Sequence, residues 1–275
     1  MNEPTLAVYL FGYRLNQIKY PWRESIESAL ALADAVYFCE AQGDDGTWED
    51  AQEIAAREHR LHLIRHSWEG DYSVQAVLGN LLLDEIGTQY DFALKLDADE
   101  VFGEWSFKDF KTDLLIMLGR NYALGCPHYT HFCPDDKHEF DFIYRSKAVV
   151  SDTHAHLRFD LGHGGDACAL GGAKEYQTRL EIMHFGKMSM GREREALQKE
   201  YDFQQKYVAL GFPDPIVVDQ KNNLGYIDYE AIFHLAKEAG QFREYHGRYP
   251  VFVEKYLDQM RKRHQEWKNG QSILS

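Results

Sequence analysis

The stretch LKLDADEVF, residues 94–102, places three acidic residues directly after an apolar segment and ahead of another apolar pair. The acids are Asp97, Asp99 and Glu100. Carboxylates this close repel one another, so either they lie on a solvated turn or a cation lies between them. Strand alternation would place Asp97 and Asp99 on one side and turn Glu100 away. The stretch therefore predicts a strand that ends in two carboxylates able to face one ion.

Alternating strand and helix patterns precede this stretch. Such alternation with short connections is typical of a parallel α/β sheet with right-handed crossovers. Ligands bind such sheets at the carboxyl ends of the strands. The acidic loops 44–50 and 97–100 each follow a predicted strand, so we expect both at that edge. Strands are predicted at 5–12, 35–41, 61–66 and 91–96, and helices at 24–33, 51–55 and 71–86.

The regular alternation ends near Glu104, and the segments that follow are joined by long loops rich in His, Asp and Gly. Loops of that length inside a compact domain are typical of functional segments. From Arg192 onward we expect mainly helix around a Pro-, Asn- and Gly-rich connection at 211–225. A helix is also predicted at 107–117, and strands at 121–127, 140–146 and 178–185.

Composition narrows the class of protein. The chain has 275 residues and a formal net charge of -14, which disfavours a large contact with duplex nucleic acid. No segment approaches the roughly 20 apolar residues of a membrane helix, and the N-terminus does not read as a secretory signal. The four cysteines are scattered and form no CxxC pair, which is typical of reduced thiols. We therefore expect a cytoplasmic protein.

The segment LEIMHFGKM, residues 180–188, ends an apolar strand on a histidine. An imidazole at a strand end can point into a cleft, where it is a common ligand for Mn²⁺-class ions. The alternative is a core histidine with one satisfied hydrogen bond. Lys187 follows shortly after, and its charge would either meet a phosphate or be solvated. His184 is therefore a candidate ligand, and Lys187 a candidate phosphate contact.

A second group of histidines lies in the middle of the chain. The HxH pair of His154 and His156 is a pattern that some zinc hydrolases use. Asp160 and His163 fall too far along for the metallo-β-lactamase pattern. The nearby GHGG is not a phosphate-binding P-loop, which would require GK[ST]. These residues do not predict a hydrolytic zinc site.

Taken together, the motifs resemble the GT-A glycosyltransferases, especially the family-2 enzymes, over roughly residues 5–190. That family has a second strand ending in an acid, followed by an Asp-Gly-Ser-x-Asp loop. Here Glu40 ends that strand and DGTWE, residues 45–49, follows it. The resemblance implies that Glu40 and Asp45 face the nucleobase and ribose of a sugar nucleotide.

The same family carries an Asp-x-Asp metal motif and a later strand ending in His-Phe-Gly or His-Tyr-Gly. The resemblance implies that Asp97 and Asp99 hold Mn²⁺ or Mg²⁺ with the diphosphate, and that His184 completes the coordination. Two motifs in this order are more specific than either alone. Asp97 and Lys187 also belong to the implied donor-binding set.

Some positions depart from the family pattern. Thr47 and Glu49 replace Ser and Asp, and the basic residue usual on the helix before the metal strand is missing from 71–86. The acceptor-side base of such enzymes often lies in a Gly-Asp-Ala-like segment, which Asp166 matches best. Asp152 and Asp160 are competitors. A retaining enzyme would need no such base.

The resemblance implies a Rossmann-like α/β GT-A fold with a mixed central sheet and a helical C-terminal extension. The glycosyltransferase domain would span 1–190, with a nucleotide-sugar half at 1–103 and an acceptor-side half at 104–190. The helical extension would span 191–275.

The implied activity is metal-dependent, hexosyltransferase-like transfer of a sugar from a nucleotide-diphosphate sugar to a hydroxyl-type acceptor. A nucleotidyltransferase using the same carboxylates, or a non-catalytic sugar-nucleotide-binding protein, is the alternative. The sequence does not indicate whether the acceptor is a glycan, a protein, a lipid or a modified nucleobase.

Overall fold

The structure is a computed structural model of the 275-residue chain. It describes residues 3–68, 74–132, 137–140, 150–159, 174–186, 216–219, 224–227 and 242–268. The sequence-based predictions for Asp160, His163, Asp166 and Lys187, and for most of the strand expected at 140–146, lie outside the described residues.

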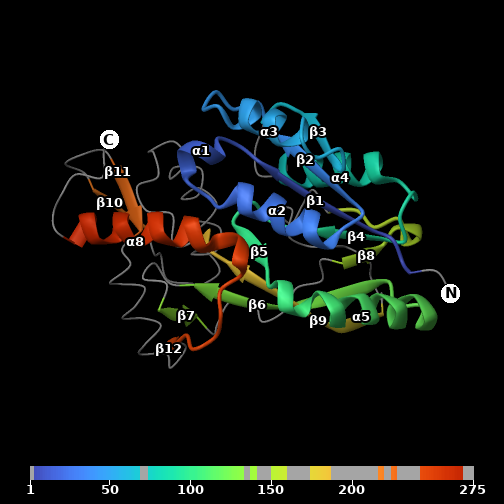
Figure 1. The fold of residues 1–275 in the computed structure, drawn as a ribbon. Helices are drawn as coiled ribbons and strands as arrows, with labels where there is room; N and C mark the ends of the chain where they lie inside the picture. Colours follow the sequence, from blue (N-terminus) through green and yellow to red (C-terminus); the bar gives the residue numbers. More distant parts are fainter. Residues whose placement is uncertain are drawn as a thin grey trace.

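Four parallel strands form one side of the central sheet, in the order β4-β1-β2-β3. Each strand lies where the alternation predicts it, and the three helices that connect them do so too (Figure 1). The strands are β1 (Leu6–Gly12), β2 (Ala35–Glu40), β3 (Leu61–Arg65) and β4 (Phe92–Lys95), and the helices are α2 (Trp22–Leu32), α3 (Thr47–Ala55) and α4 (Val74–Ile86). A short helix, α1 (Leu15–Ile18), that the sequence analysis does not predict follows β1.

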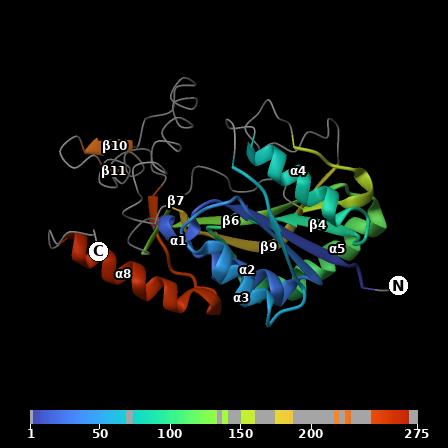
Figure 2. The ribbon, with the colours of Figure 1, turned by 90° about the horizontal axis from the view of Figure 1, so that it is seen from above.

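Both faces of β1, β2 and β4 are covered. Leu6, Val8 and Leu10 of β1 pack into a core with α2, whereas the alternate residues Ala7 and Tyr9 pack against α4. Figure 2 shows α2 and α4 on opposite faces of the sheet. Because both faces of these three strands are buried, they read as continuous apolar runs, whereas β3 at the edge is only partly buried.

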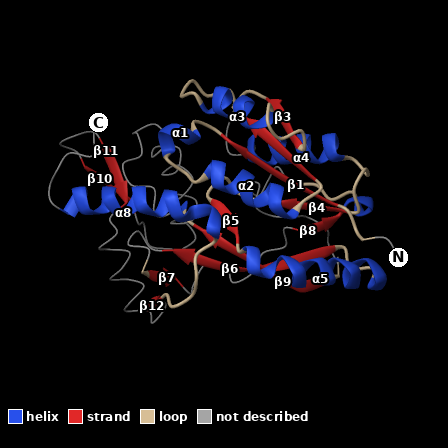
Figure 3. Ribbon diagram, viewed as in Figure 1, coloured by secondary structure: helices blue, strands red, loops and turns tan. Residues whose placement is uncertain are grey.

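The second part of the sheet is mixed. Strand β8 pairs antiparallel with β4, β6 pairs with β8, and β9 lies parallel to β6 and antiparallel to the short β5. All of them belong to one ten-stranded sheet, and Figure 3 shows helix α5 along this part. The bounds are β5 (Glu100–Phe102), β6 (Leu124–Phe132), β7 (His138–Phe140), β8 (Val150–Asp152), β9 (Glu175–His184), β12 (Phe242–Glu244), the 3₁₀ turns η1 (Glu104–Ser106) and η2 (Thr153–Ala155), and α5 (Phe107–Arg120).

The C-terminal part contains the expected helix and also strands that the sequence analysis does not predict. Helix α8 (Glu254–Lys268) follows the 3₁₀ turn η4 (Val251–Val253) and packs Tyr256, Leu257 and Met260 against Phe132 and Phe185. Strands β10 (Ile216–Asp219) and β11 (Leu224–Ile227) pair antiparallel where a connection is predicted at 211–225, with β11 ending two residues beyond it, and β12 pairs with β7.

Candidate functional site

The acidic stretch after β4 is a turn and not a strand end. The strand stops at Lys95, and the Glu100 backbone N–H donates to the Asp97 carbonyl at 3.0 Å. The Asp97 backbone N–H in turn donates to Glu100 Oε2 at 2.9 Å. The prediction that alternation turns Glu100 away from Asp97 is therefore wrong, because alternation no longer applies once the chain leaves the strand. Glu100 is buried and caps the turn.

Asp99 and His184 meet across a strand pair. In the β5–β9 ladder Glu100 lies opposite His184, and the Phe185 backbone N–H donates to the Asp99 carbonyl at 2.8 Å. This register brings Asp99 Oδ2 to 3.4 Å from His184 Nε2. Their side chains are 12% and 20% exposed, respectively, so both are shielded yet reachable.

Gly186 makes this approach possible. A Cβ at position 186 would lie 2.2 Å from Asp99 Oδ2 and 2.9 Å from His184 Cε1. Both distances are shorter than real Cβ contacts, so any side chain here would displace one of the two groups. The His-Phe-Gly order thus has a physical reason: the glycine leaves room for the carboxylate beside the imidazole.

A second histidine lies beside His184. His131 of β6 is in register with His184 of β9, and their ring centroids lie 4.8 Å apart. The Tyr129 ring stacks on that of His131, with 5.7 Å between their centroids. Sequence reasoning leaves His131 unassigned, because only strand pairing places it at this site.

Lys95 lies under the acidic turn. Its Nζ is 3.0 Å from Asp97 Oδ1, and the residue is only 5% exposed. The rings of Phe11 and Phe159 each lie 5.8 Å from the ammonium. Sequence reasoning also misses this residue, although a lysine within an apolar strand is a signal in itself, because a buried cation needs a partner.

The donors of Asp99 and His184 fit a divalent ion. Two ligands at about 2.1 Å and at right angles around a hexacoordinate ion lie roughly 3 Å apart, close to the 3.4 Å between Asp99 Oδ2 and His184 Nε2. A carboxylate with an imidazole is a ligand pair that first-row divalent ions, Mn²⁺ among them, can accept. Within the described ranges, no group of three His, Cys, Asp or Glu side chains is close enough together to hold an ion. A donor ligand or water would have to complete the shell.

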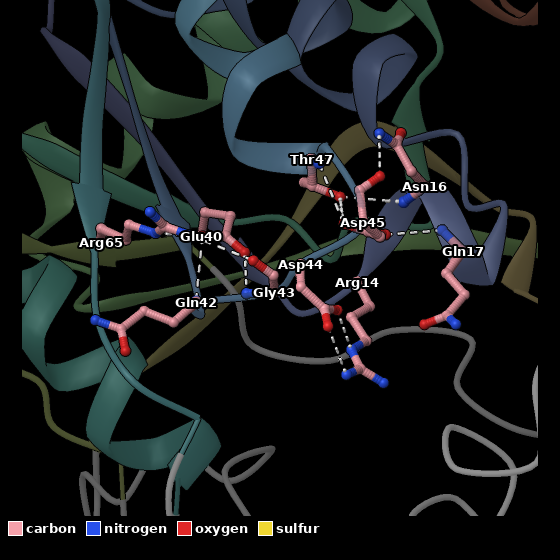
Figure 4. Close-up of polar contacts among 10 residues, drawn as sticks. All are labelled: Arg14, Asn16, Gln17, Glu40, Gln42, Gly43, Asp44, Asp45, Thr47 and Arg65. Atoms are coloured by element: carbon pink, nitrogen blue, oxygen red, sulfur yellow. Dashed lines mark hydrogen bonds and ion pairs between the residues drawn. The ribbon is translucent and has the colours of Figure 1, made fainter.

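A second polar group lies at the end of β2 (Figure 4). The Glu40 side chain has no exposed surface. Its carboxylate accepts hydrogen bonds from the backbone N–H groups of Gln42 and Gly43 and from Arg65 Nε, the last at 3.0 Å. Glu40 therefore holds the loop after β2 and ties it to β3. Its contact with a nucleobase stays a prediction.

Asp45 joins this loop to helix α1, which follows β1. Its Oδ2 accepts the Gln17 backbone N–H at 2.8 Å, and its Oδ1 accepts the Thr47 hydroxyl at 2.7 Å (Figure 4). Gly46 between them has a φ of 84°, a left-handed conformation that glycine adopts without strain. The Asp-Gly-Thr sequence thus builds the N-terminus of α3, and the contact of Asp45 with a ribose stays a prediction.

Two arginines that sequence reasoning leaves out flank this loop. Arg65 is 40% exposed and lies over the Trp48 ring, with 5.1 Å to its centroid. Arg14 Nε lies 2.9 Å from the exposed carboxylate of Asp44 (Figure 4). The carboxyl edge of the sheet therefore combines fixed acids with partly exposed guanidinium groups, a surface able to bind an anionic ligand.

Asp152, the competing candidate for the base, lies at the opposite end of the parallel strands, where β4 begins. It is in register with Phe92, the first residue of β4, whereas the acidic turn follows the last. Its Oδ1 accepts the His154 backbone N–H at 2.8 Å, so Asp152 caps a 3₁₀ turn. Asp152 therefore lies at the opposite end of β4 from the acidic turn, and its role as a base stays a prediction. His154 lies within the same turn and His156 directly follows it, and both are exposed.

Comparisons with known proteins bear on the fold. No protein-family model and no curated protein matches the sequence. Among solved structures, the mannosyltransferase PcManGT from Pyrobaculum calidifontis, in complex with GDP-Man and Mn²⁺, is 12% identical, with 99% of this chain and 77% of that chain covered and a TM-score of 0.50. The chain has a GT-A-like glycosyltransferase fold.

Another similar structure is S. aureus TarS 1–349, at 14% identity and a TM-score of 0.40. Its complex with UDP is 13% identical, also with a TM-score of 0.40. The alignment spans 64% of this chain but only 60% of TarS 1–349. Among the helices of the described part of the chain, none is both long and apolar enough to cross a membrane.

Proposed function

We propose that this protein is a metal-dependent glycosyltransferase that transfers a sugar from a nucleotide-diphosphate sugar to a hydroxyl-type acceptor. The observation that carries the proposal is the 3.4 Å approach of Asp99 Oδ2 to His184 Nε2. The two residues come from distant parts of the chain and meet next to the carboxyl ends of the parallel strands, where such sheets bind ligands. The GT-A-like fold supports the same conclusion, and the two motifs favour the family-2 type.

In this proposal Asp99 and His184 hold Mn²⁺ or Mg²⁺, and Asp97 contributes to the same donor site. The bound ion supplies positive charge that stabilises the leaving diphosphate. Glu40 and Asp45 keep the two loops after β1 and β2 in fixed positions to receive the nucleoside, through the hydrogen bonds described above. Fixed loops lower the entropy lost on binding the donor.

The proposed reaction breaks the bond between the anomeric carbon and the diphosphate oxygen and forms one to the acceptor oxygen. In an inverting enzyme, Asp166 would take the acceptor hydroxyl proton as general base. Lys187 would bring a positive charge to the diphosphate. The donor would bind to 1–103, the acceptor to 104–190, and the extension at 191–275 would adjoin the acceptor.

Thermal unfolding with ligands tests this function. Wild-type protein is heated alone, with Mn²⁺, with UDP or GDP, and with Mn²⁺ and each nucleotide together. A ligand at 100 times its Kd stabilises the folded state by about 2.7 kcal/mol. Because we expect the ion and the nucleotide to bind together, Tm should rise only where Mn²⁺ and the matching nucleotide are both present. Asp99→Asn should abolish this rise, and Asp258→Asn, at an exposed site on α8, should not.

Turnover separates an enzyme from a binding protein. A panel of sugar nucleotides is incubated with Mn²⁺ and protein, and release of the nucleoside diphosphate is measured. Release that depends on Asp99 supports a transferase, because water replaces the missing acceptor. Metal-dependent nucleotide binding without any release, with or without candidate acceptors, would favour the non-catalytic alternative. Absence of both binding and release would refute the proposed function.

A further inference from the structure

Lys95 is a buried cation beside the acidic turn. Its side chain is 6% exposed, and its ammonium lies 3.0 Å from Asp97 Oδ1. The rings of Phe11 and Phe159, each 5.8 Å away, line its surroundings. Placing an ammonium here is unfavourable unless its charge is compensated, and the carboxylate of Asp97 provides that charge. The pair is therefore a fixed feature of the site.

The pair changes the charge of the turn. Asp97, Asp99 and Glu100 bring three carboxylates within four residues. Asp97 is held through its carboxylate by Lys95 and through its backbone N–H by Glu100. The ammonium offsets one of the three negative charges, and it does so in surroundings where water screens charge weakly. A divalent ion at Asp99 and His184 therefore meets less negative charge than the sequence of the turn indicates.

We propose that Lys95 is a positioning residue that couples binding of the divalent ion to binding of the diphosphate. By holding Asp97 and offsetting its charge, Lys95 keeps the affinity of the Asp99–His184 pair for a free ion low. The diphosphate brings its own negative charge and oxygen ligands, so the ion binds tightly only together with it. This inference rests on the proposed function and adds that the ion and the diphosphate bind cooperatively.

The coupling is measured directly. The Kd of Mn²⁺ is determined by electron paramagnetic resonance, which detects the free aqueous ion, with and without saturating UDP or GDP. The ratio of the two Kd values is the coupling factor, and it applies equally to both ligands. For the wild type we expect a factor of about 10 or more, within the usual range for linked sites.

Removing the ammonium should weaken the coupling between binding of the ion and binding of the nucleotide. Lys95→Met keeps the length and apolar body of the side chain, so we expect Mn²⁺ alone to bind at least about fivefold more tightly and the coupling factor to fall at least about threefold. Lys95→Gln should shift both in the same direction, and Lys95→Arg should keep the wild-type values. Lys111→Met removes a charge at an exposed site on α5 and should change neither.

A double variant tests whether Asp97 carries the effect. Lys95→Met with Asp97→Asn removes both members of the pair and restores the net charge of the turn. Its Mn²⁺ affinity should return to within about twofold of the wild type, because paired residues give non-additive effects. Tm and circular dichroism of each variant establish that it is folded.

Two outcomes separate the failure of this inference from that of the proposed function. If the wild type binds Mn²⁺ and nucleotide together but folded Lys95→Met and Lys95→Gln leave both the Mn²⁺ affinity and the coupling factor unchanged, only this inference is overturned. If the wild type binds no nucleotide in the presence of Mn²⁺, the proposed function and this inference both fall.

Discussion

Gly186 offers the sharpest test of the geometry around Asp99. The change is Gly186→Ala, which adds one methyl group where Asp99 Oδ2 would lie 2.2 Å away and Asp99 Cγ 3.2 Å away. Since real Cβ contacts essentially never fall under 3.0 Å, the carboxylate oxygen must move by about 0.8 Å or the glycine backbone must shift. His184 Cε1, 2.9 Å from the same methyl group, restricts the second route.

The expected effects are a moderate loss of stability and a larger loss of metal binding. Overfilling a packed site costs about 1–3 kcal/mol, and in a chain of this length each kcal/mol lowers Tm by about 2–4 °C. We therefore expect Tm to fall by about 2–12 °C. A ligand displaced by this much should weaken Mn²⁺ binding by about 10–100-fold, as loss of supporting contacts does at other metal sites.

The assay is Mn²⁺ titration in the presence of the nucleotide, alongside thermal unfolding. Gly119→Ala is the matched control, because a Cβ at that position in α5 meets nothing within 4 Å. It should leave Mn²⁺ binding unchanged and stabilise the helix by up to about 1 kcal/mol. If folded Gly186→Ala binds Mn²⁺ as tightly as the wild type, the assignment of Asp99 and His184 as ligands is wrong.

Three further predictions concern the body of the fold. Asp113 is fully buried, and its carboxylate accepts hydrogen bonds from the Arg179 backbone N–H at 2.7 Å and from the Arg179 guanidinium at 2.6 Å. Asp113→Ala should therefore lower the free energy of unfolding, measured by urea titration, by about 2–4 kcal/mol. A loss under about 0.5 kcal/mol would contradict this. Burial, together with the charge of Glu27, raises the pKa of Glu24 above 4.5 in the folded state. The folded state therefore favours the protonated carboxyl, and the stability that this gives is lost as pH rises through the folded-state pKa. Glu24→Gln should therefore raise Tm by about 1–4 °C at pH 7–8, with a gain that vanishes well below pH 4.5; the same gain at both pH values would refute the explanation. Burial, followed by the charge of Glu40, raises the pKa of the Cys39 thiol to about 12, so mass spectrometry should find this cysteine unlabelled by iodoacetamide at pH 8 in the folded protein and labelled in urea.

The sequence by itself determined the parallel half of the fold. Strands β1 to β4 and helices α2 to α4 lie where the apolar patterns predict them, because burial on both faces of a sheet or on one stripe of a helix leaves a local periodicity. The GT-A-like fold implied by the motifs is likewise confirmed by the structural comparison. The roles of individual site residues stay predictions.

The tertiary structure decided how the carboxylates of the turn are used. Strand β5 is only three residues long, too short to leave a periodic signal, yet its pairing with β9 brings Asp99 to His184. The turn at 97–100 points Glu100 back to the Asp97 backbone, and the buried ammonium of Lys95 offsets the charge of Asp97. Strand register and the burial of a charge depend on residues far away in the chain, so a local pattern shows that carboxylates are gathered but not what each one faces.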